Sequence, residues 1–257
     1  MTTYLDHILE RHREAAVADT RSVDDVVRSA SASPRPRPFA AALRADGLAV
    51  IAEIKRRSPS KGVLDPSLDP ATTARDYERG GAVALSVLTD AEFFGGSVDD
   101  LRAARDATRL PVLRKDFTVD RRDVADARLM GADAVLLIVA ALGPVELIEL
   151  HQQGVELGLD VLVEVHDEPE LEQALQCGAT LVGVNQRDLV TFEVDHARAE
   201  RMAGAIPPDV VKVAESGVRA AADARRLRDA GYDAVLVGET LVIAPDRPSA
   251  VADLLTR

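Results

Sequence analysis

Residues 130–137 read Met-Gly-Ala-Asp-Ala-Val-Leu-Leu, in which a glycine and a short spacer precede an apolar run. The same arrangement recurs in three further segments, residues 79–87, 177–184 and 230–237. Each glycine follows a helix-like stretch, so we expect it to end a helix in the left-handed conformation. The apolar run after each glycine is typical of a strand that is buried on both faces, as in a parallel sheet.

Four more apolar runs alternate with these units, at Leu48–Ile54, Pro111–Leu113, Val161–Val165 and Val210–Ala214. Helix-like segments separate the eight runs, and the clearest are 72–79, 121–130, 144–157, 168–176 and 220–230. Eight alternations of strand and helix predict an α/β fold of the (β/α)8 TIM-barrel type. A doubly wound open sheet is the alternative, but none of the strands is followed by the G-x-G-x-x-G motif of that fold.

The first 45 residues precede the predicted barrel and contain two helix-like segments, Leu5–Val17 and Val23–Ala30. A Pro-Arg-rich stretch at 31–38 predicts an extended linker. The sequence therefore predicts an N-terminal helical extension at 1–45 and one barrel domain at 46–257. His7 and His12 are five positions apart in a largely polar segment, so we expect them to lie on a solvated face.

The composition is that of a globular protein in water, with 47% hydrophobic and 29% charged residues. The net charge of −12 and the absence of a basic run argue against nucleic acid as a partner. The longest apolar run, Ala134–Leu142, is too short to span a bilayer, and no signal-peptide pattern is present, so we expect a cytoplasmic protein. Cys177 is the only cysteine and excludes an internal disulfide, and no histidine pair has the spacing of a zinc motif.

Lysine is rare in this chain, since only four of the 31 basic residues are lysine. Three of the four, Lys55, Lys61 and Lys115, lie in two short segments, 51–62 and 111–117. A desolvated lysine can lose its proton near neutral pH, whereas arginine cannot. These lysines are therefore candidates for proton transfer or for a compact positive charge.

In a barrel, alternate strand residues point inward, and chemistry takes place at the C-terminal ends of the strands. The inward-pointing polar residues predicted at these ends are Glu53, Lys55, Lys115, Glu164, His166, Asn185 and Glu215. Buried charges are costly unless they are paired, so their convergence on one mouth indicates a catalytic site. Ion pairs that merely line a solvated mouth are the structural alternative.

The loops that follow the strands add two further features. The turns Glu215-Ser216-Gly217 and Gly238-Glu239 stand where barrels bind phosphate through backbone amides. The loop at 56–64 is basic and long enough to close over a ligand. Phe93 and Phe94, with Phe117 from another loop, indicate a flat apolar part of the substrate, and we expect one of the adjacent pair to anchor the loop in the core instead.

These segments together resemble the indole-3-glycerol-phosphate synthase family. Its first-strand signature resembles Ile51-Ala-Glu-Ile-Lys-Arg-Arg-Ser-Pro-Ser, and the likeness continues in order through 85–90, 94–97, 113–117, 135–138, 162–165, 184–189 and 213–217. The resemblance implies a (β/α)8 barrel with an N-terminal helical extension. It also implies ring closure of 1-(2-carboxyphenylamino)-1-deoxyribulose 5-phosphate, with loss of carbon dioxide and water, to indole-3-glycerol phosphate in tryptophan biosynthesis. No metal or organic cofactor is expected.

The resemblance implies a role for each matched residue. Lys115 would be the general acid that protonates the ketone oxygen. Glu164 would stabilise developing positive charge or move a proton in dehydration, and Glu53 would be a second proton-transfer carboxylate. Lys55 would hold anionic groups of the substrate, including its phosphate, and share the acid role. Asn185 and Glu215 would bind the sugar hydroxyls or hold the lysines in place. Lys55 would lower the pKa of Lys115 and the glutamates would raise it, and the sequence leaves open which effect is larger.

The remaining assignments concern substrate binding. The expected substrate-binding residues are Ser58, Pro59, Phe94, Phe117 and Leu136, with Arg187 supporting its loop. The expected phosphate-binding residues, besides Lys55, are Ser216, Gly217, Gly238 and Glu239. Some family members carry serine at the position of Glu239, so we expect its carboxylate to point away from the ligand and only its amide to bind.

Three other functions are compatible with a lysine-bearing barrel. The first is a Schiff-base lyase or aldolase that uses Lys115 or Lys55 on a sugar phosphate. The second is phosphoribosylanthranilate isomerase, which does not need two lysines and several glutamates in one mouth. The third is a non-catalytic sugar-phosphate sensor, which gives no reason for these charges to converge. The sequence does not set the oligomeric state, and no obligate protein partner is visible.

Overall fold

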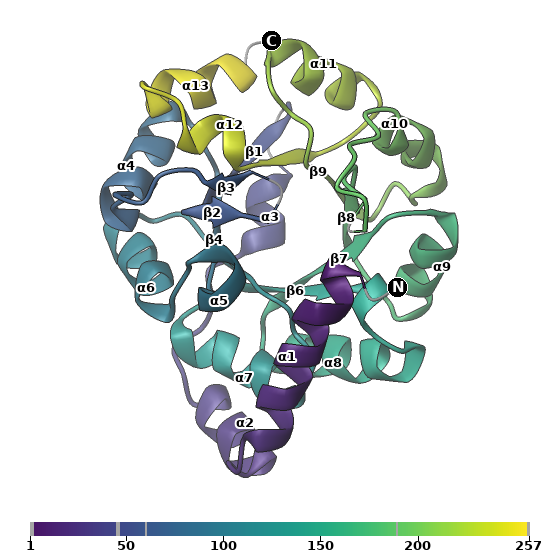
Figure 1. Cartoon of the computed structure of the whole chain (residues 1–257). Coiled ribbons are helices and arrows are strands. Elements are labelled where there is room, and N and C mark those ends of the chain that lie inside the picture. Colours follow the sequence, from purple (N-terminus) through teal and green to yellow (C-terminus); the bar gives the residue numbers. More distant parts are fainter. Residues whose placement is uncertain (1–2, 45–46, 60, 189, 256–257) are drawn as a thin grey trace.

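The computed structural model describes residues 3–44, 47–59, 61–188 and 190–255. Eight parallel strands close into a barrel in the order β1-β10-β9-β8-β7-β6-β5-β4 (Figure 1). Its strands are β1 (Ala49–Ile54), β4 (Ala84–Leu88), β5 (Val112–Lys115), β6 (Ala134–Ile138), β7 (Asp160–Val165), β8 (Leu181–Asn185), β9 (Val211–Glu215) and β10 (Ala234–Val237). The predicted (β/α)8 barrel is confirmed, and all eight predicted apolar runs contribute a strand.

Helices surround the barrel (Figure 1). The longer ones are α4 (Pro70–Gly80), α6 (Val98–Ala107), α7 (Arg121–Met130), α8 (Pro144–Glu156), α9 (Glu168–Gln176), α11 (Ala221–Asp229) and α13 (Arg247–Leu254). The short ones are α5 (Ala91–Phe94), α10 (Arg198–Met202), α12 (Glu239–Val242) and the 3-10 turns Val139–Ala141 and Ala203–Ala205. The repeat glycines Gly81, Gly131, Gly178 and Gly231 have φ between 88° and 98°, as a left-handed helix end requires.

Strand pairing brings the polar residues at the strand ends to one level. Asn185 in β8 pairs in register with Glu215 in β9, and Glu164 in β7 pairs with Ile138 in β6. All but three of the barrel-strand residues are buried, which explains why the strands read as apolar runs. The polar residues at the C-terminal ends of the strands, Lys115, Asn185 and Glu215, stand at the mouth, above an apolar barrel interior.

The N-terminal extension runs from the mouth of the barrel to its opposite end. It contains α1 (Tyr4–Ala18), which lies over one edge of the mouth, α2 (Val23–Ser31), which packs on α7, and α3 (Phe39–Leu43) (Figure 1). The amide of Ala40 donates to Asp160 Oδ2 at 2.8 Å, at the start of β7. The sequence did not predict α3, whose Phe39 and Leu43 are fully buried. The predicted boundary at 45/46 lies outside the described residues.

The basic loop after β1 contains regular structure that the sequence did not predict. Its ends form an antiparallel hairpin of β2 (Arg57–Ser58) and β3 (Gly62–Val63). Arg56 fixes the base of the hairpin, because it pairs with Asp100 and donates to the carbonyl of Leu68 at 3.1 Å. Among the described residues, no helix is long and apolar enough to cross a membrane.

Phe39→Ala should destabilise the protein by about 3–5 kcal/mol, because it opens a cavity where α3 closes the barrel. Urea unfolding followed by circular dichroism measures the loss. Val17→Ala is the matched control, since Val17 is 88% exposed, and it should change the unfolding free energy by less than about 0.5 kcal/mol. Equal effects of the two substitutions would show that α3 is not part of the cooperative core.

Candidate active site

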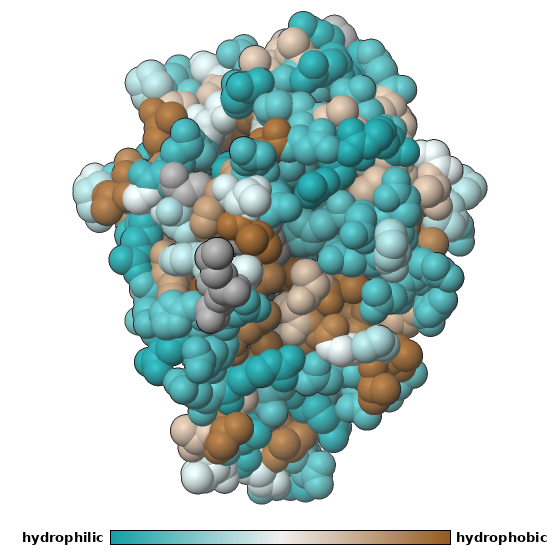
Figure 2. Space-filling view, turned by 45° about the vertical axis from the view of Figure 1, so that its right-hand side comes forward, coloured by the Kyte–Doolittle hydropathy of each residue, from teal (hydrophilic) through white to brown (hydrophobic). Residues whose placement is uncertain are grey.

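The mouth of the barrel holds a pocket of about 410 Å³, a size that suits a small phosphorylated metabolite. Apolar side chains gather at the hollowed middle of this face, within a polar surround (Figure 2). His166, which the sequence predicted at the same mouth, does not line this pocket, but all the residues predicted to bind or transform the substrate do. They are Glu53, Lys55, Ser58, Pro59, Phe94, Lys115, Phe117, Leu136, Glu164, Asn185, Arg187, Glu215, Ser216, Gly217, Gly238 and Glu239.

Lys115, at the end of β5, is held by two buried carboxylates. Its Nζ lies 2.8 Å from Glu164 Oε2 and 3.0 Å from Glu215 Oε2. Asn185 Nδ2 donates to the other oxygen of Glu164 at 2.9 Å. These contacts link the ends of β5, β7, β8 and β9, so the position of the ammonium is fixed by four strands.

The charges in this cluster shift one another's pKa values. Burial lowers the pKa of the Lys115 ammonium, but the carboxylates of Glu164, Glu215 and Glu53 outweigh burial, so the pKa lies above its ordinary value. Burial raises the pKa of Glu164, but Lys115 outweighs it and lowers that pKa to about 2. Burial raises the pKa of Glu215 to about 7, and Glu164 adds to the effect. The pKa of Lys115 is therefore set by the glutamates, which raise it, and not by Lys55.

Lys55 and Glu53 form a second pair at the end of β1. Lys55 Nζ lies 2.7 Å from Glu53 Oε1, and Ser86 Oγ donates to Glu53 Oε2 at 3.3 Å. Glycines make room for both sets of carboxylates. A Cβ at Gly238 would overlap the Glu53 carboxylate, and a Cβ at Gly183 would overlap Glu215. Any larger residue at either glycine would displace an acidic group of the site.

The turn after β9 has a strained backbone. Ser216 has φ 65° and Gly217 has φ 76°. A left-handed conformation costs a residue other than glycine about 1 kcal/mol or more and is common at ligand sites. A Cβ at Gly217 would lie 2.8 Å from Val194 Cγ1, so this position also needs glycine for space. The turn and Gly238, which precedes α12, line the same part of the pocket.

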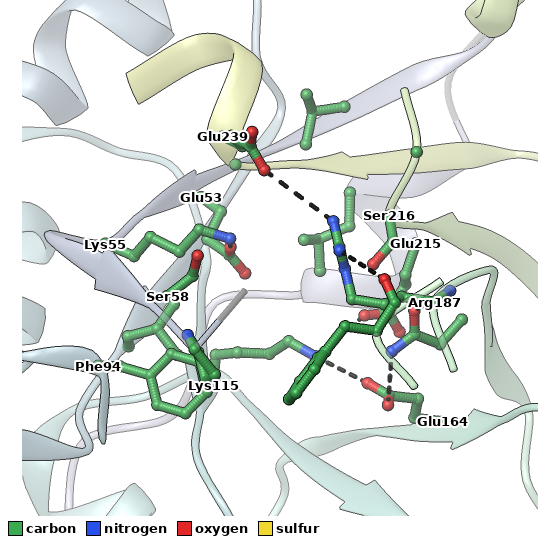
Figure 3. Close-up of a pocket in the computed structure, with 18 of the residues that line it drawn as sticks. Glu53, Lys55, Ser58, Phe94, Lys115, Glu164, Arg187, Glu215, Ser216 and Glu239 are labelled. Carbon is green, nitrogen blue, oxygen red and sulfur yellow. Dashed lines mark hydrogen bonds and ion pairs between the residues drawn. The ribbon is translucent and has the colours of Figure 1, made fainter. Parts of the chain in front are cut away.

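From the sequence we expected the Glu239 side chain to point away from the pocket, but in the structure it lines the pocket. Its Oε1 lies 3.7 Å from Lys61 Nζ, and its Oε2 lies 4.0 Å from Arg187 Nη2 (Figure 3). Arg187 Nη1 also donates to the carbonyl of Phe192 at 3.1 Å, which agrees with the predicted support of its loop. The carboxylate thus engages two cations at the rim of the pocket.

Aromatic and aliphatic side chains form the apolar wall. Phe94 and Phe117 have ring centroids 6.3 Å apart and line the pocket, whereas Phe93 is buried against Tyr4. This division between Phe93 and Phe94 is the expected one. The sequence analysis missed the contribution of α1 and of the loop after β8, which bring Tyr4, Leu5, Ile8 and Phe192 to the pocket. The i, i+3 spacing of Leu5 and Ile8 was the available signal.

The expectation of a solvated face is wrong for His12, whose side chain is 20% exposed. His12 Nε2 lies 3.0 Å from Asp90 Oδ2 and 3.8 Å from Asp116 Oδ1, which ties α1 to the loops after β4 and β5. His7 is exposed but packs its ring against Phe93, with centroids 5.7 Å apart. Burial lowers the pKa of His12, but the hydrogen bond to Asp90 and the charge of Asp116 outweigh it and raise the pKa.

His12, Asp90 and Asp116 are also a group whose ligand atoms lie close enough to hold a metal ion. The chain's own donors already engage the two carboxylates. Asp90 Oδ1 accepts from the amide of Phe93 at 2.6 Å, and Asp116 Oδ2 accepts from Arg114 at 3.0 Å. We therefore interpret His12, Asp90 and Asp116 as a structural link between α1 and the mouth of the barrel.

Comparison with known proteins shows the family of the chain. A family model described as "Indole-3-glycerol phosphate synthase" matches residues 5–254. An indole-3-glycerol phosphate synthase of Mycolicibacterium vanbaalenii is 52% identical over 260 residues, which cover 99% of this chain and 94% of that protein. Indole-3-glycerol phosphate synthase 2 of Streptomyces coelicolor is 54% identical over 226 residues, or 88% of each chain.

Solved structures with low sequence identity show the fold alone. A thiamine phosphate pyrophosphorylase from Pyrococcus furiosus superposes with a TM-score of 0.62 at 18% identity, over 82% of this chain and 95% of that one. An N-acetylmannosamine-6-phosphate 2-epimerase from Clostridium perfringens gives a TM-score of 0.62 at 14% identity, over 79% and 90% of the two chains.

Because the pKa of Glu215 is raised by folding, we expect the stability of the protein to depend on pH. The Glu215 carboxyl binds a proton more tightly when folded, with a pKa of about 7 against 4.5 for an ordinary glutamate, so its contribution to stability falls as the pH rises between these values. Glu215→Gln should gain stability relative to the wild type across this window. Urea unfolding at pH 4.5, 5.5, 6.5 and 7.5 measures the difference, with the exposed Glu172→Gln as control. A difference that is the same at every pH would contradict the assignment.

His12→Asn should loosen α1. The pKa of His12 is raised on folding, so the stabilisation is complete below the ordinary value of about 6.5 and is lost as the pH rises through the raised value. Hydrogen exchange of residues 4–18, corrected for intrinsic rates, should be about tenfold faster in the variant at pH 6 and nearly equal to the wild type at pH 9. Glu10→Gln, at an exposed position of the same helix, is the control. Unchanged exchange at pH 6 would exclude this link.

Proposed function

The chain belongs to the indole-3-glycerol phosphate synthase family, and we propose that the cluster around Lys115 performs its ring closure. The protein is a carboxy-lyase of tryptophan biosynthesis. The observation that carries the residue assignment is the ammonium of Lys115, which is held between Glu164 and Glu215 at the base of the pocket.

The pocket offers a separate place for each part of the substrate. We assign the aromatic ring to the wall of Phe94, Phe117 and Leu136, with Ser58 and Pro59 bordering it from the hairpin. The phosphate is assigned to the amides of Ser216, Gly217, Gly238 and Glu239, with Lys55 as the nearby cation. Glu239 then has to release Lys61 and Arg187 for the incoming phosphate. These assignments leave the ketone of the sugar chain above Lys115.

Ring closure begins when an aromatic carbon attacks the ketone carbon and Lys115 gives a proton to the ketone oxygen. The raised pKa of Lys115 ensures that the proton is present before the reaction. The carboxylate of Glu164 stabilises the positive charge that develops on the ring and nitrogen. Carbon dioxide then leaves, and the electrons of the broken carbon–carbon bond restore the aromatic ring. Asn185 and Glu215 hold Glu164 and Lys115 in place during these steps.

Dehydration completes the reaction. The hydroxyl formed from the ketone receives a second proton, from Lys55 or a reprotonated Lys115, and leaves as water. A carboxylate, Glu53 or Glu164, removes the proton from the neighbouring carbon. Two protons are delivered and one is recovered, so each turnover takes up one proton from the solvent. This uptake balances the negative charge of the substrate carboxylate, which leaves as neutral carbon dioxide.

The electrostatics of the site argue against the Schiff-base alternative. A lysine that forms a Schiff base has to lose its proton, and such lysines have a lowered pKa. The carboxylates around Lys115 raise its pKa instead. The family model and the two sequence relatives described above carry the name of the synthase, and they give no support to the isomerase or sensor alternatives.

Location and partners complete the proposal. We assign the enzyme to the cytoplasm, acting on a small-molecule substrate without nucleic acid, membrane contact or an obligate protein partner. The net charge of −12 supports the absence of nucleic acid. We further propose that residues 1–45 extend the barrel at 46–257 without forming a separate domain, because α1 contributes to the pocket.

Lys115→Arg tests the acid assignment. Arginine keeps the positive charge between the two carboxylates but cannot give up a proton near neutral pH. We expect the rate of indole-3-glycerol phosphate formation to fall about 10²–10⁴-fold, measured by indole absorbance and fluorescence with chelator present. Lys212→Arg is the matched control, because the side chain of Lys212 donates to the carbonyl of Ala203 and is not among the pocket-lining residues.

Two results would contradict the proposal. Near wild-type turnover in Lys115→Arg would remove Lys115 as the acid. A covalent adduct trapped by borohydride in the presence of substrate would instead favour the Schiff-base lyase.

A further inference from the structure

His166 lies behind Glu164, just beyond the end of β7. Its Nδ1 is 3.0 Å from Glu170 Oε2, and its backbone amide donates to the same oxygen at 2.7 Å. Glu170 stands in the first turn of α9, four residues further along the chain. The carboxylate of Glu170 thus fixes both the backbone and the ring of His166. His166 is not among the residues that line the pocket, so it does not reach the substrate.

The other ring nitrogen of His166 faces the catalytic carboxylate. Its Nε2 is 3.6 Å from Glu164 Oε1, is buried, and has no hydrogen-bond partner among the described residues. If the ring is neutral and Nδ1 carries the proton toward Glu170, a lone pair of Nε2 faces the negative charge of Glu164. If the ring is an imidazolium, an N–H group and a positive charge face Glu164 instead. Only the second form makes an attractive contact on both sides.

We propose that His166, held by Glu170, is a positioning residue that gives Glu164 a second positive neighbour beside Lys115 and thereby sets how readily Glu164 accepts a proton. The proposal deepens the function above and rests on the role assigned there to Glu164. It explains why a buried histidine stands between two carboxylates, only one of which lines the pocket.

The charged groups around His166 come from four elements. Glu164 faces it from β7 and Glu170 from α9, whereas Arg198 of α10 opposes its positive charge, and Lys115 of β5 lies beyond Glu164. Burial lowers the pKa of His166, but the hydrogen bond to Glu170 and the charge of Glu164 outweigh burial and raise it. Titration of His166 therefore changes the charge next to Glu164.

Removing the imidazole has a pH-dependent consequence. In His166→Asn, Glu164 keeps Lys115 but loses the second cation, so its titration midpoint should rise by about 1–3 pH units. The acidic limb of the kcat profile should move to higher pH by a comparable amount. The ratio of wild-type to variant kcat should increase as the pH falls through the raised midpoint of Glu164 and should be constant at higher pH. A purely structural role would lower kcat by the same factor at every pH.

The test combines NMR titration with kinetics on the full-length enzyme. The ¹³C shift of the Glu164 carboxyl and the ¹⁵N shifts of the His166 ring are followed in the wild type, His166→Asn and Glu170→Gln. In Glu170→Gln, His166 should titrate at lower pH than in the wild type. Glu172→Gln, at an exposed position of the same helix, should leave both titrations unchanged.

The outcomes separate this inference from the proposed function. An unchanged Glu164 midpoint in His166→Asn overturns the inference, even if the enzyme turns over. A wild type without turnover overturns the proposed function, while the NMR titrations still decide the relation between His166 and Glu164. If His166→Asn does not fold, an unchanged His166 titration in Glu170→Gln overturns the inference instead.

Discussion

The buried ion cluster of Lys115, Glu164 and Glu215 is the constraint around which the mouth of the barrel is built. Burying three charges is unfavourable unless each meets an opposite partner, and the distances of 2.8 Å and 3.0 Å from Lys115 Nζ meet that condition. The cluster also explains which residues occupy the positions around it. Gly183 leaves space for Glu215, and Asn185 uses its amide on the free oxygen of Glu164.

The cluster carries one more negative charge than positive charge when all its groups are ionised. Glu215 is the carboxylate that takes up a proton and removes this extra charge. Its pKa of about 7 lets Glu215 take a proton where Glu164, with a pKa of about 2, does not. Two carboxylates of the same type therefore differ in charge near neutrality because of their surroundings. The site thereby obtains one carboxylate that is ionised near neutral pH and one whose charge follows the pH.

Local patterns in the sequence predicted the barrel strands and the charged residues at their ends, whereas the resemblance to the family supplied the substrate-binding residues such as Pro59 and Leu136. Apolar runs mark strands that are buried on both faces, and alternation along a strand correctly places Glu53 and Lys55 together at the pocket. His166 was predicted to share the inward face of Glu164, but it follows the end of the strand and lies outside the pocket. The elements that the sequence analysis missed depend on tertiary contacts. The five residues of α3 are too few to show a period, and His12 reads as solvated until Asp90 and Asp116, far along the chain, are placed beside it.

The N-terminal extension connects the two ends of the barrel, and this has a consequence for the chemistry. Its α3 closes the end opposite the mouth with Phe39 and Leu43, while α1 brings Leu5 and Ile8 to the pocket. Apolar side chains over the mouth exclude water and so strengthen the attraction between Lys115 and its carboxylates. The segment that looks least catalytic in the sequence therefore helps to set the electrostatics of the site, through its apolar side chains and through the contacts of His12 with Asp90 and Asp116.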